Sequence, residues 1–250
     1  MPKTLIEQKP DFSKKVDGES KLGIAEMFSD TLQGEGTHTG VPATFIRLQG
    51  CTLKCKWCDT IDVWPHGNEY SFEEIFKLFD SINLSERLKE GQHLVFTGGS
   101  PLKQQDRLYA FVQDFIGRYG FKPYIEIENE GVILAEEKFI KLVDCWNNSP
   151  KLANSGMKEK ARLKPEVIKQ LNGFENSWFK FVISDESDWE EIEKDFLPLI
   201  DKEKVILMPE GITQEELNPR REFVAGMAIK HGVRFSDRLH VTIWNKKTGV

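Results

Sequence analysis

The segment HLVFTGGSPLKQQDRLYAFVQDFIGRYG, residues 93–120, shows the unit that decides the fold. Residues 93–97 form a short β-prone run, and residues 103–119 follow with the spacing of apolar positions typical of an amphipathic helix. Gly120 comes directly after them, where helices favour glycine. The segment therefore predicts a strand, a loop and a helix in succession.

The same alternation recurs on both sides of this segment. Expected strands cover residues 43–49, 124–128, 178–184, 204–208 and 238–244, and expected helices cover residues 71–82, 135–143, 188–200 and 214–231. Ser71 and Asp188 are suitable N-caps, and Gly232 follows the last expected helix.

About six strand–helix units in series imply parallel strands joined by right-handed crossovers. Six units are too few to close an eight-unit barrel, so we expect an α/β fold with a partial, open-sided (β/α)6 barrel. A flat doubly wound sheet is the competing arrangement. In either fold, ligands bind at the carboxyl ends of the strands.

The chain has 250 residues, of which 39% are hydrophobic, enough for one large core. Residues 1–22 mix both charges and lack periodicity, so we expect an N-terminal extension followed by one domain over residues 23–250. The net charge of −6 argues against direct nucleic-acid binding. The sequence shows neither a long apolar run nor a signal peptide, so we expect a soluble, cytoplasmic protein without a membrane partner.

Three of the four cysteines, Cys51, Cys55 and Cys58, lie in one loop directly after the expected strand 43–49. Three thiolates can hold three corners of a [4Fe–4S] cluster and leave one iron open to a ligand. The alternative from spacing alone is a zinc site completed by Cys145 or a histidine. Cys145 otherwise fits a small hydrophobic core residue.

The CxxxCxxC spacing, with Trp57 before the third cysteine, resembles the signature of the radical S-adenosylmethionine superfamily. That resemblance implies S-adenosylmethionine on the open iron, with Trp57 near its adenine. Gly98, Gly99 and Ser100 resemble the superfamily's Gly-Gly-Glu-Pro motif, with Ser100 at the position of the usual glutamate. Further cofactor contacts that the resemblance implies are Glu128, Ser149, Pro150, Lys151, Met208, Pro209, Glu210 and Gly211.

Motifs on both sides of the cysteines narrow the resemblance. LQGEG at residues 32–36, GVPATFIRLQGC at 40–51 and CDT at 58–60 resemble the 7-carboxy-7-deazaguanine synthase family, over roughly residues 24–250. Membership would imply a radical lyase that contracts the ring of 6-carboxy-5,6,7,8-tetrahydropterin with loss of ammonia. Its product feeds the synthesis of queuosine and other 7-deazapurines.

The substrate residues follow from the same resemblance. The planar donor fork of Arg47 suits a substrate carboxylate, and the Thr60 hydroxyl would bind Mg²⁺ beside that carboxylate. The last six residues are short enough to fold over the opening and bring Val250 to the pterin. The other implied substrate residues are Leu32, Gln33, Gly34, Glu35 and Thr97.

The expected partners are a small pterin substrate, an external one-electron reductant such as flavodoxin or ferredoxin, and a second copy in a homodimer. Two rival functions remain open: a glycyl-radical activating enzyme, and a non-catalytic iron–sulfur or zinc module. His240 is the one histidine expected to approach the site. The remaining histidines show no partner pattern and are interpreted as structural or exposed: His38, His66, His93 and His231.

Overall fold

The computed structural model of the chain describes residues 2–7, 15–247 and 249. Its centre is one ten-stranded sheet in the order β1-β2-β3-β5-β6-β7-β8-β9-β10, with β4 paired to β2. The strands are β1 (Lys3–Ile6), β2 (Lys21–Leu32), β3 (Pro42–Leu48), β4 (Asn68–Ser71), β5 (His93–Gly98), β6 (Tyr124–Asn129), β7 (Cys145–Asn148), β8 (Ser177–Ile183), β9 (Val205–Pro209) and β10 (Arg234–Phe235).

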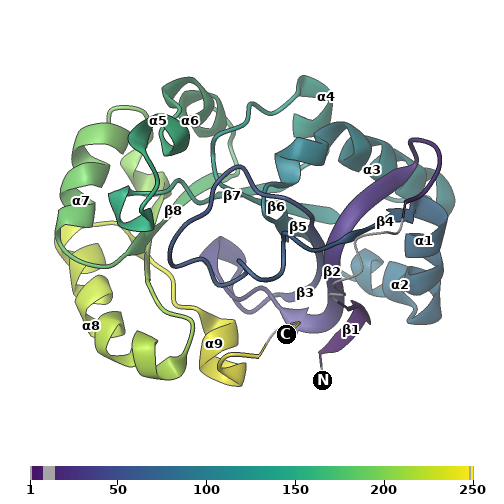
Figure 1. Cartoon of the computed structure of the whole chain (residues 1–250), viewed down its shortest axis with the longest axis horizontal. Coiled ribbons are helices and arrows are strands. Elements are labelled where there is room, and N and C mark those ends of the chain that lie inside the picture. Colours follow the sequence, from purple (N-terminus) through teal and green to yellow (C-terminus); the bar gives the residue numbers. More distant parts are fainter. Residues whose placement is uncertain (1, 8–14, 248, 250) are drawn as a thin grey trace.

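The helices lie around the outside of this curved sheet (Figure 1). They are α1 (Phe72–Ser81), α2 (Leu84–Lys89), α3 (Gln105–Tyr119), α4 (Glu137–Ile140), α5 (Glu159–Arg162), α6 (Pro165–Asn172), α7 (Ser187–Glu191), α8 (Gln214–His231) and α9 (Leu239–Trp244). Short 3-10 turns cover Gly36–His38, Pro101–Gln104, Ala153–Ser155 and Lys202–Lys204, and a π-helical turn, Ile192–Phe196, continues α7.

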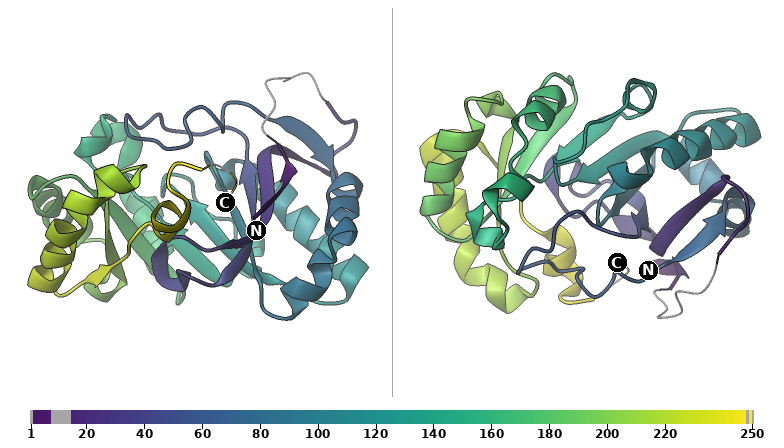
Figure 2. Two further views of the ribbon diagram at one scale, coloured as in Figure 1. Left: turned by 90° about the horizontal axis from the view of Figure 1, so that it is seen from below. Right: turned by 45° about the horizontal axis from the view of Figure 1, so that its top comes forward.

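The run from β3 through β5 to β10 is parallel, which confirms the expected α/β fold with an open sheet. Neighbouring strands end together, because Arg47 pairs with Thr97 and Leu48 with Gly98 at the ends of β3 and β5. The segment after β3 runs along this rim of the sheet (Figure 2). The carboxyl ends therefore form one edge on which a site can be built.

The N-terminal strands were not expected from the sequence. β2 is antiparallel to β1, β3 and β4, and most of its residues are buried, so it lacks the alternation that marks a half-exposed strand. β1 lies within the expected extension and pairs with β2. The boundary between an extension at 1–22 and a domain at 23–250 stays a prediction.

The expected last strand at residues 238–244 is wrong. The last strand is the two-residue β10, and the following residues form helix α9. The Leu239 amide donates to the Gly34 carbonyl oxygen at 2.8 Å, so the chain turns toward the loop after β2 instead of continuing along β9. Tertiary contacts thus override the β propensity of this valine- and isoleucine-containing stretch.

Local predictions for the helix ends are confirmed in most cases. Ser71 and Glu74 form a capping box at the start of α1, and Gly120 and Gly232 end α3 and α8 in the left-handed conformation. Asp188 is not an N-cap, because it lies inside the first turn of α7 and accepts from the Ser184 amide at 2.6 Å.

The core lies between the sheet and its outer helices. Phe76 of α1 stacks on Phe111 of α3 with ring centroids 5.1 Å apart, and Phe96 of β5 meets Phe111 edge-on. Burying such aromatic side chains fixes the helices against the strands. Among the described residues, no helix combines the length and apolarity needed to cross a bilayer.

Candidate active site

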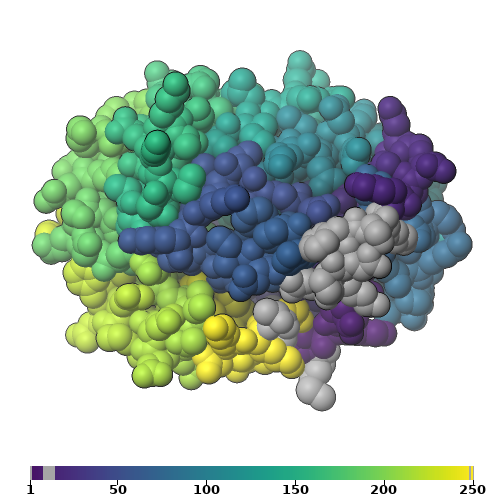
Figure 3. All heavy atoms as spheres, in the orientation of Figure 1, coloured from purple at the N-terminus to yellow at the C-terminus, as the bar shows by residue number. Residues whose placement is uncertain are grey.

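One cavity lies at the carboxyl ends of the parallel strands. The loop after β3 crosses the face of the molecule over this region (Figure 3). Residues from every quarter of the chain line the cavity, from Phe28 on β2 to His240 on α9. It is therefore a product of the whole fold.

The cysteine loop forms one wall. Cys51, Cys55 and Cys58 all line the cavity, and all four cysteines of the chain are free. Neighbouring loops hold the segment in place: the Lys56 amide donates to the Ser155 carbonyl oxygen at 2.9 Å, and Trp57 Nε1 donates to Asn154 Oδ1 at 3.1 Å. The thiols are thus gathered and fixed.

The chemistry of these thiols fits an iron–sulfur cluster. Burial raises the pKa of the Cys51 and Cys55 thiols, and at Cys55 the charges of Cys58 and Cys51 raise it further. Thiols in such surroundings ionise when a cation neutralises them. Three thiol ligands from one loop match three corners of a [4Fe–4S] cluster.

Gly98 and Gly99 let the end of β5 pack against the cysteine loop. A Cβ atom on Gly99 would lie 2.1 Å from the Gly50 carbonyl oxygen. At Gly98, where φ is +133°, it would lie 2.4 Å from the Leu48 carbonyl oxygen. The contact that requires glycine at both positions is therefore with the chain's own backbone.

Ser100 is fully buried beneath the cavity. Its Oγ accepts from the Thr52 amide at 2.9 Å and donates to Glu130 Oε1 at 2.6 Å, and Thr52 Oγ1 donates to the same oxygen at 2.6 Å. Glu130 lines the cavity, and its Oε2 is buried without a hydrogen bond. Glu130 is thus a carboxylate residue of the cavity lining that the sequence analysis missed.

The other predicted cofactor residues lie along the next strand ends. Lys151 Nζ donates to Ser149 Oγ at 2.8 Å and lies 5.3 Å from the centre of the Trp57 ring. Pro150 and Pro209 are buried and do not line the cavity. The predicted residues that do line it are Trp57, Gly98, Gly99, Glu128, Ser149, Lys151, Met208, Glu210 and Gly211.

The predicted substrate residues line the same cavity. Gln33 Nε2 donates to Glu128 Oε1 at 3.2 Å, which fixes its amide. Arg47 Nε donates to Glu26 Oε1 at 2.7 Å, and the Thr60 hydroxyl lies 3.6 Å from Cys58 Sγ. The predicted substrate and magnesium residues that line the cavity are Leu32, Gln33, Gly34, Glu35, Arg47, Thr60 and Thr97.

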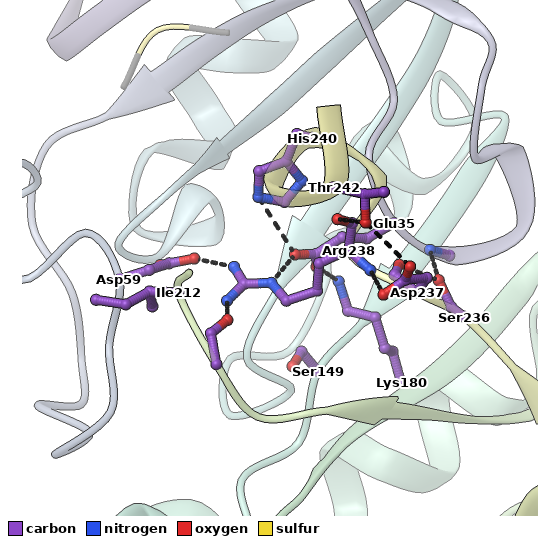
Figure 4. Close-up of polar contacts among 12 residues, drawn as sticks. Glu35, Asp59, Ser149, Lys180, Ile212, Ser236, Asp237, Arg238, His240 and Thr242 are labelled. Carbon is purple, nitrogen blue, oxygen red and sulfur yellow. Dashed lines mark hydrogen bonds and ion pairs between the residues drawn. The ribbon is translucent and has the colours of Figure 1, made fainter. Parts of the chain in front are cut away.

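Glu35 is clamped between two cations that the sequence analysis missed (Figure 4). Lys180 of β8 forms an ion pair with Glu35 Oε2, and Arg238 Nε donates to Glu35 Oε1 at 2.9 Å. Burial raises the pKa of Glu35, but the charges of Lys180 and Arg238 outweigh it and hold the pKa well below its usual range. Glu35 is therefore a buried carboxylate that stays ionised.

Arg238 also joins the cysteine loop to the C-terminal part of the chain. It forms a second ion pair with Asp59, directly after Cys58, and donates to the Gly211 carbonyl oxygen. One sequence feature could have indicated Lys180: a charged residue inside an otherwise apolar expected strand. His240 lines the cavity, but from helix α9 and not from a strand.

Val250 lies outside the described residues, so its predicted substrate contact stays a prediction. Gly249 lies beside β1, where an added Cβ atom would be 3.1 Å from Thr4 Oγ1.

Comparison with known proteins places this chain in a family. The model of a 4Fe-4S single cluster domain matches residues 32–136. The crystal structure of QueE from Escherichia coli superposes with a TM-score of 0.65 and 25% identity, covering 88% of this chain and 95% of that chain.

Full-length relatives carry one name. The 7-carboxy-7-deazaguanine synthase of Pyrobaculum aerophilum is 32% identical over 232 residues, 92% of this chain and 97% of that protein. The enzyme of the same name from Halobacterium salinarum is 32% identical over 246 residues, 90% of this chain and 91% of that protein. At this identity over nearly its whole length, the chain belongs to the 7-carboxy-7-deazaguanine synthase family.

Proposed function

We propose that the protein converts 6-carboxy-5,6,7,8-tetrahydropterin to 7-carboxy-7-deazaguanine by radical ring contraction with loss of ammonia, a step toward queuosine and other 7-deazapurines. One observation carries the proposal: a single cavity is lined both by the three cysteines and by Gln33, Glu35 and Arg47. The names of the full-length relatives support it.

The loop that carries the three cysteines binds the cofactors. A bound [4Fe–4S] cluster, with S-adenosylmethionine on its open iron, supplies a carbon-centred radical after one-electron reduction. Cys51, Cys55 and Cys58 hold the cluster. The Glu130 carboxylate, which lines the cavity, would accept from the ammonium group of a bound S-adenosylmethionine, and Trp57 and Lys151, which lie side by side, would contact its adenine.

Ser100, Pro150 and Pro209 support this side without lining the cavity. Ser100 holds Glu130 and the Thr52 backbone together. Pro150 and Pro209 lie at the ends of β7 and β9, next to the cavity-lining Ser149 and Met208. We assign to these three residues the positioning of their neighbours.

Glu35, Gln33 and Arg47 bind the pterin. Its amino group and ring N–H form two adjacent donors, and the ionised Glu35 can accept both because its orientation is fixed by Lys180 and Arg238. Gln33, whose amide is oriented by Glu128, forms hydrogen bonds with the remaining polar edge of the pterin. The Arg47 guanidinium faces the substrate carboxylate, since a planar fork suits two carboxylate oxygens.

Mg²⁺ joins this assembly through Thr60. Thr60 lines the same cavity as Arg47, so its hydroxyl would hold the cation near the substrate carboxylate. Mg²⁺ keeps several waters or substrate oxygens, and one protein ligand therefore suffices.

The cluster requires an external one-electron donor, and we infer flavodoxin or ferredoxin as that donor. We also infer a homodimer. Exposed apolar side chains on α8 and α9 support a partner surface, namely Phe223, Ile229 and Ile243. Light scattering of the purified chain tests the dimer, and reduction by each donor tests the reductant.

The decisive experiment is an anaerobic assay with reconstituted protein, S-adenosylmethionine, reductant and carboxytetrahydropterin. We expect formation of the deazaguanine and of equal ammonia, followed by chromatography. Reductive cleavage of S-adenosylmethionine without pterin conversion would indicate a radical enzyme that acts on another substrate. Colourless protein that contains zinc and cleaves no S-adenosylmethionine would exclude the radical chemistry altogether.

A further inference from the structure

Four side chains of metal-binding type meet at the amino-terminal end of the parallel strands. His93 begins β5, Cys145 begins β7, and Glu126 lies on β6 between them, paired with Cys145. His38 ends the 3-10 turn Gly36–His38. These four residues, here called the basal cluster, do not line the cavity at the carboxyl ends.

The donor atoms of the basal cluster are close together. One ligand atom each from His38, Glu126 and Cys145 lies within 4.8 Å of the other two. His38 Nδ1 is 3.3 Å from Glu126 Oε1, and His93 Nδ1 contacts that same oxygen. A tetrahedral ion with bonds of about 2.0–2.3 Å fits between the three donors of His38, Glu126 and Cys145, and His93 is the next donor because its Nδ1 contacts Glu126 Oε1.

Three of the donor residues lie in the interior of the protein. Glu126 and Cys145 are 0% exposed, and His93 is 8% exposed. The second carboxylate oxygen of Glu126 is already occupied, since Asn147 Nδ2 donates to it at 2.7 Å and Gln33 Nε2 at 3.3 Å. Oε1 is therefore held toward the two histidines.

The contacts within the basal cluster converge on one carboxylate oxygen and one thiol. His38 Nδ1 is buried and lies 3.3 Å from Glu126 Oε1, the oxygen that His93 Nδ1 also contacts, and His38 Nε2 lies 3.5 Å from the Tyr124 hydroxyl. Cys145 Sγ is buried beside a carboxylate, and its hydrogen-bonding contact is with Thr37 Oγ1 at 3.8 Å. Two imidazole nitrogens directed at one carboxylate oxygen, with a buried thiol beside them, form a donor set that a metal ion would satisfy.

From this geometry we propose that the basal cluster binds one Zn²⁺ ion, with His38, Glu126 and Cys145 as ligands and His93 as the fourth. Two imidazoles, a thiolate and a carboxylate form a borderline-soft donor set that suits zinc and not Mg²⁺ or Ca²⁺. The thiolate and the carboxylate also neutralise the charge of the ion, as a buried site requires.

The zinc site would stabilise the loop at residues 33–36, which carries predicted substrate residues. Glu126 holds Gln33, and His38 follows the 33–36 loop directly, so an ion at the basal cluster fixes both ends of that loop. Its role is structural, because four protein donors leave no open coordination position.

Zinc analysis of the cluster-loaded protein tests the proposal, because iron then occupies Cys51, Cys55 and Cys58. After exposure to Zn²⁺ and desalting, we expect about one zinc per chain in the wild type. Cys145→Ser and His38→Gln should each lower zinc affinity at least about tenfold. His231→Gln, in a histidine that stacks on Trp189 away from the basal cluster, is the matched control and should retain zinc.

Cobalt spectroscopy identifies the ligand independently. In a chain with Cys51→Ala, Cys55→Ala and Cys58→Ala, Cys145 is the remaining thiol. Co²⁺ should then give a thiolate charge-transfer band and intense visible bands of a tetrahedral site, and added Cys145→Ser should abolish them. Circular dichroism checks that each variant is folded. Zinc-free wild type, or zinc retained undiminished by both Cys145→Ser and His38→Gln, would overturn the proposal.

Discussion

The Ser100 hydroxyl donates a 2.6 Å hydrogen bond to Oε1 of Glu130, from the loop after β5 to the loop after β6. Ser100 stands where the superfamily motif carries a glutamate. Glu130 brings a carboxylate to the cavity beside it, with Oε2 buried and unpaired. We propose that this neighbouring strand end supplies the acidic group that the motif itself lacks.

Glu130→Gln should weaken S-adenosylmethionine binding about ten- to a hundredfold, because a charge-assisted hydrogen bond contributes about 1.5–3 kcal/mol. Iron content should not change. Anaerobic equilibrium dialysis of the cluster-loaded protein measures the affinity, with Glu166→Gln on the exposed face of α6 as control. Combining Glu130→Ser with Ser100→Glu should restore part of the loss. Equal affinity in wild type and Glu130→Gln would remove Glu130 from the cofactor site.

Replacing any one of Cys51, Cys55 or Cys58 with alanine should abolish cluster binding, because two thiolates do not hold a stable cubane. Cys145→Ala should keep the full iron content, since Cys145 lies in the basal cluster. Iron analysis and the visible spectrum after anaerobic reconstitution measure this. An equal loss of iron in Cys145→Ala would contradict the three-ligand assignment.

Thr60→Ala should lower turnover and flatten the dependence of rate on Mg²⁺ concentration without changing iron content. The variant loses one oxygen ligand to the cation, which affects substrate placement and not the cluster. Thr52→Val is not a suitable control, because Thr52 holds Glu130, whereas Thr39→Val alters an exposed threonine near the turn before β3. A magnesium titration that matches wild type would exclude Thr60 as a ligand.

Lys180→Met should move the acid limb of the kcat/KM profile to higher pH. Lys180 and Arg238 hold the pKa of Glu35 well below its usual range against the opposing effect of burial. Without Lys180 that pKa rises, so Glu35 becomes protonated, and loses its acceptor role, at a higher pH. Lys169→Met on α6 changes an exposed lysine and should leave the profile unchanged. If the pH profile of Lys180→Met matches that of the wild type, the ionisation of Glu35 does not control substrate binding.

Gly99→Ala should destabilise the fold by about 1–3 kcal/mol, as overpacked sites do, and should reduce cluster loading. The added Cβ atom would meet the Gly50 carbonyl oxygen and the Cys51 amide. Gly117→Ala on α3 meets open space and should stabilise by about 0.5–1 kcal/mol. Thermal unfolding and iron content check both variants. Normal iron loading in Gly99→Ala would show that the cysteine loop tolerates the shift.

The sequence by itself determined the features that rest on neighbouring residues. The strand–helix units follow from local periodicity, as in β5 and α3, and the capping box follows from Ser71 and Glu74. The cysteine loop can be recognised from the sequence alone, because its three ligands lie within eight consecutive residues, 51–58. Such patterns are readable because the interacting groups are close in the chain.

Only the tertiary structure decided the groups whose partners are far apart. Lys180 reaches Glu35 across 145 residues and Arg238 reaches it across 203, and Glu126 joins the basal cluster only when β5, β6 and β7 lie side by side. Helix α9 likewise forms where the chain meets the loop at Gly34. Local propensity carries no information about such pairs, because their energies arise from burial and charge that exist only once the sheet has assembled.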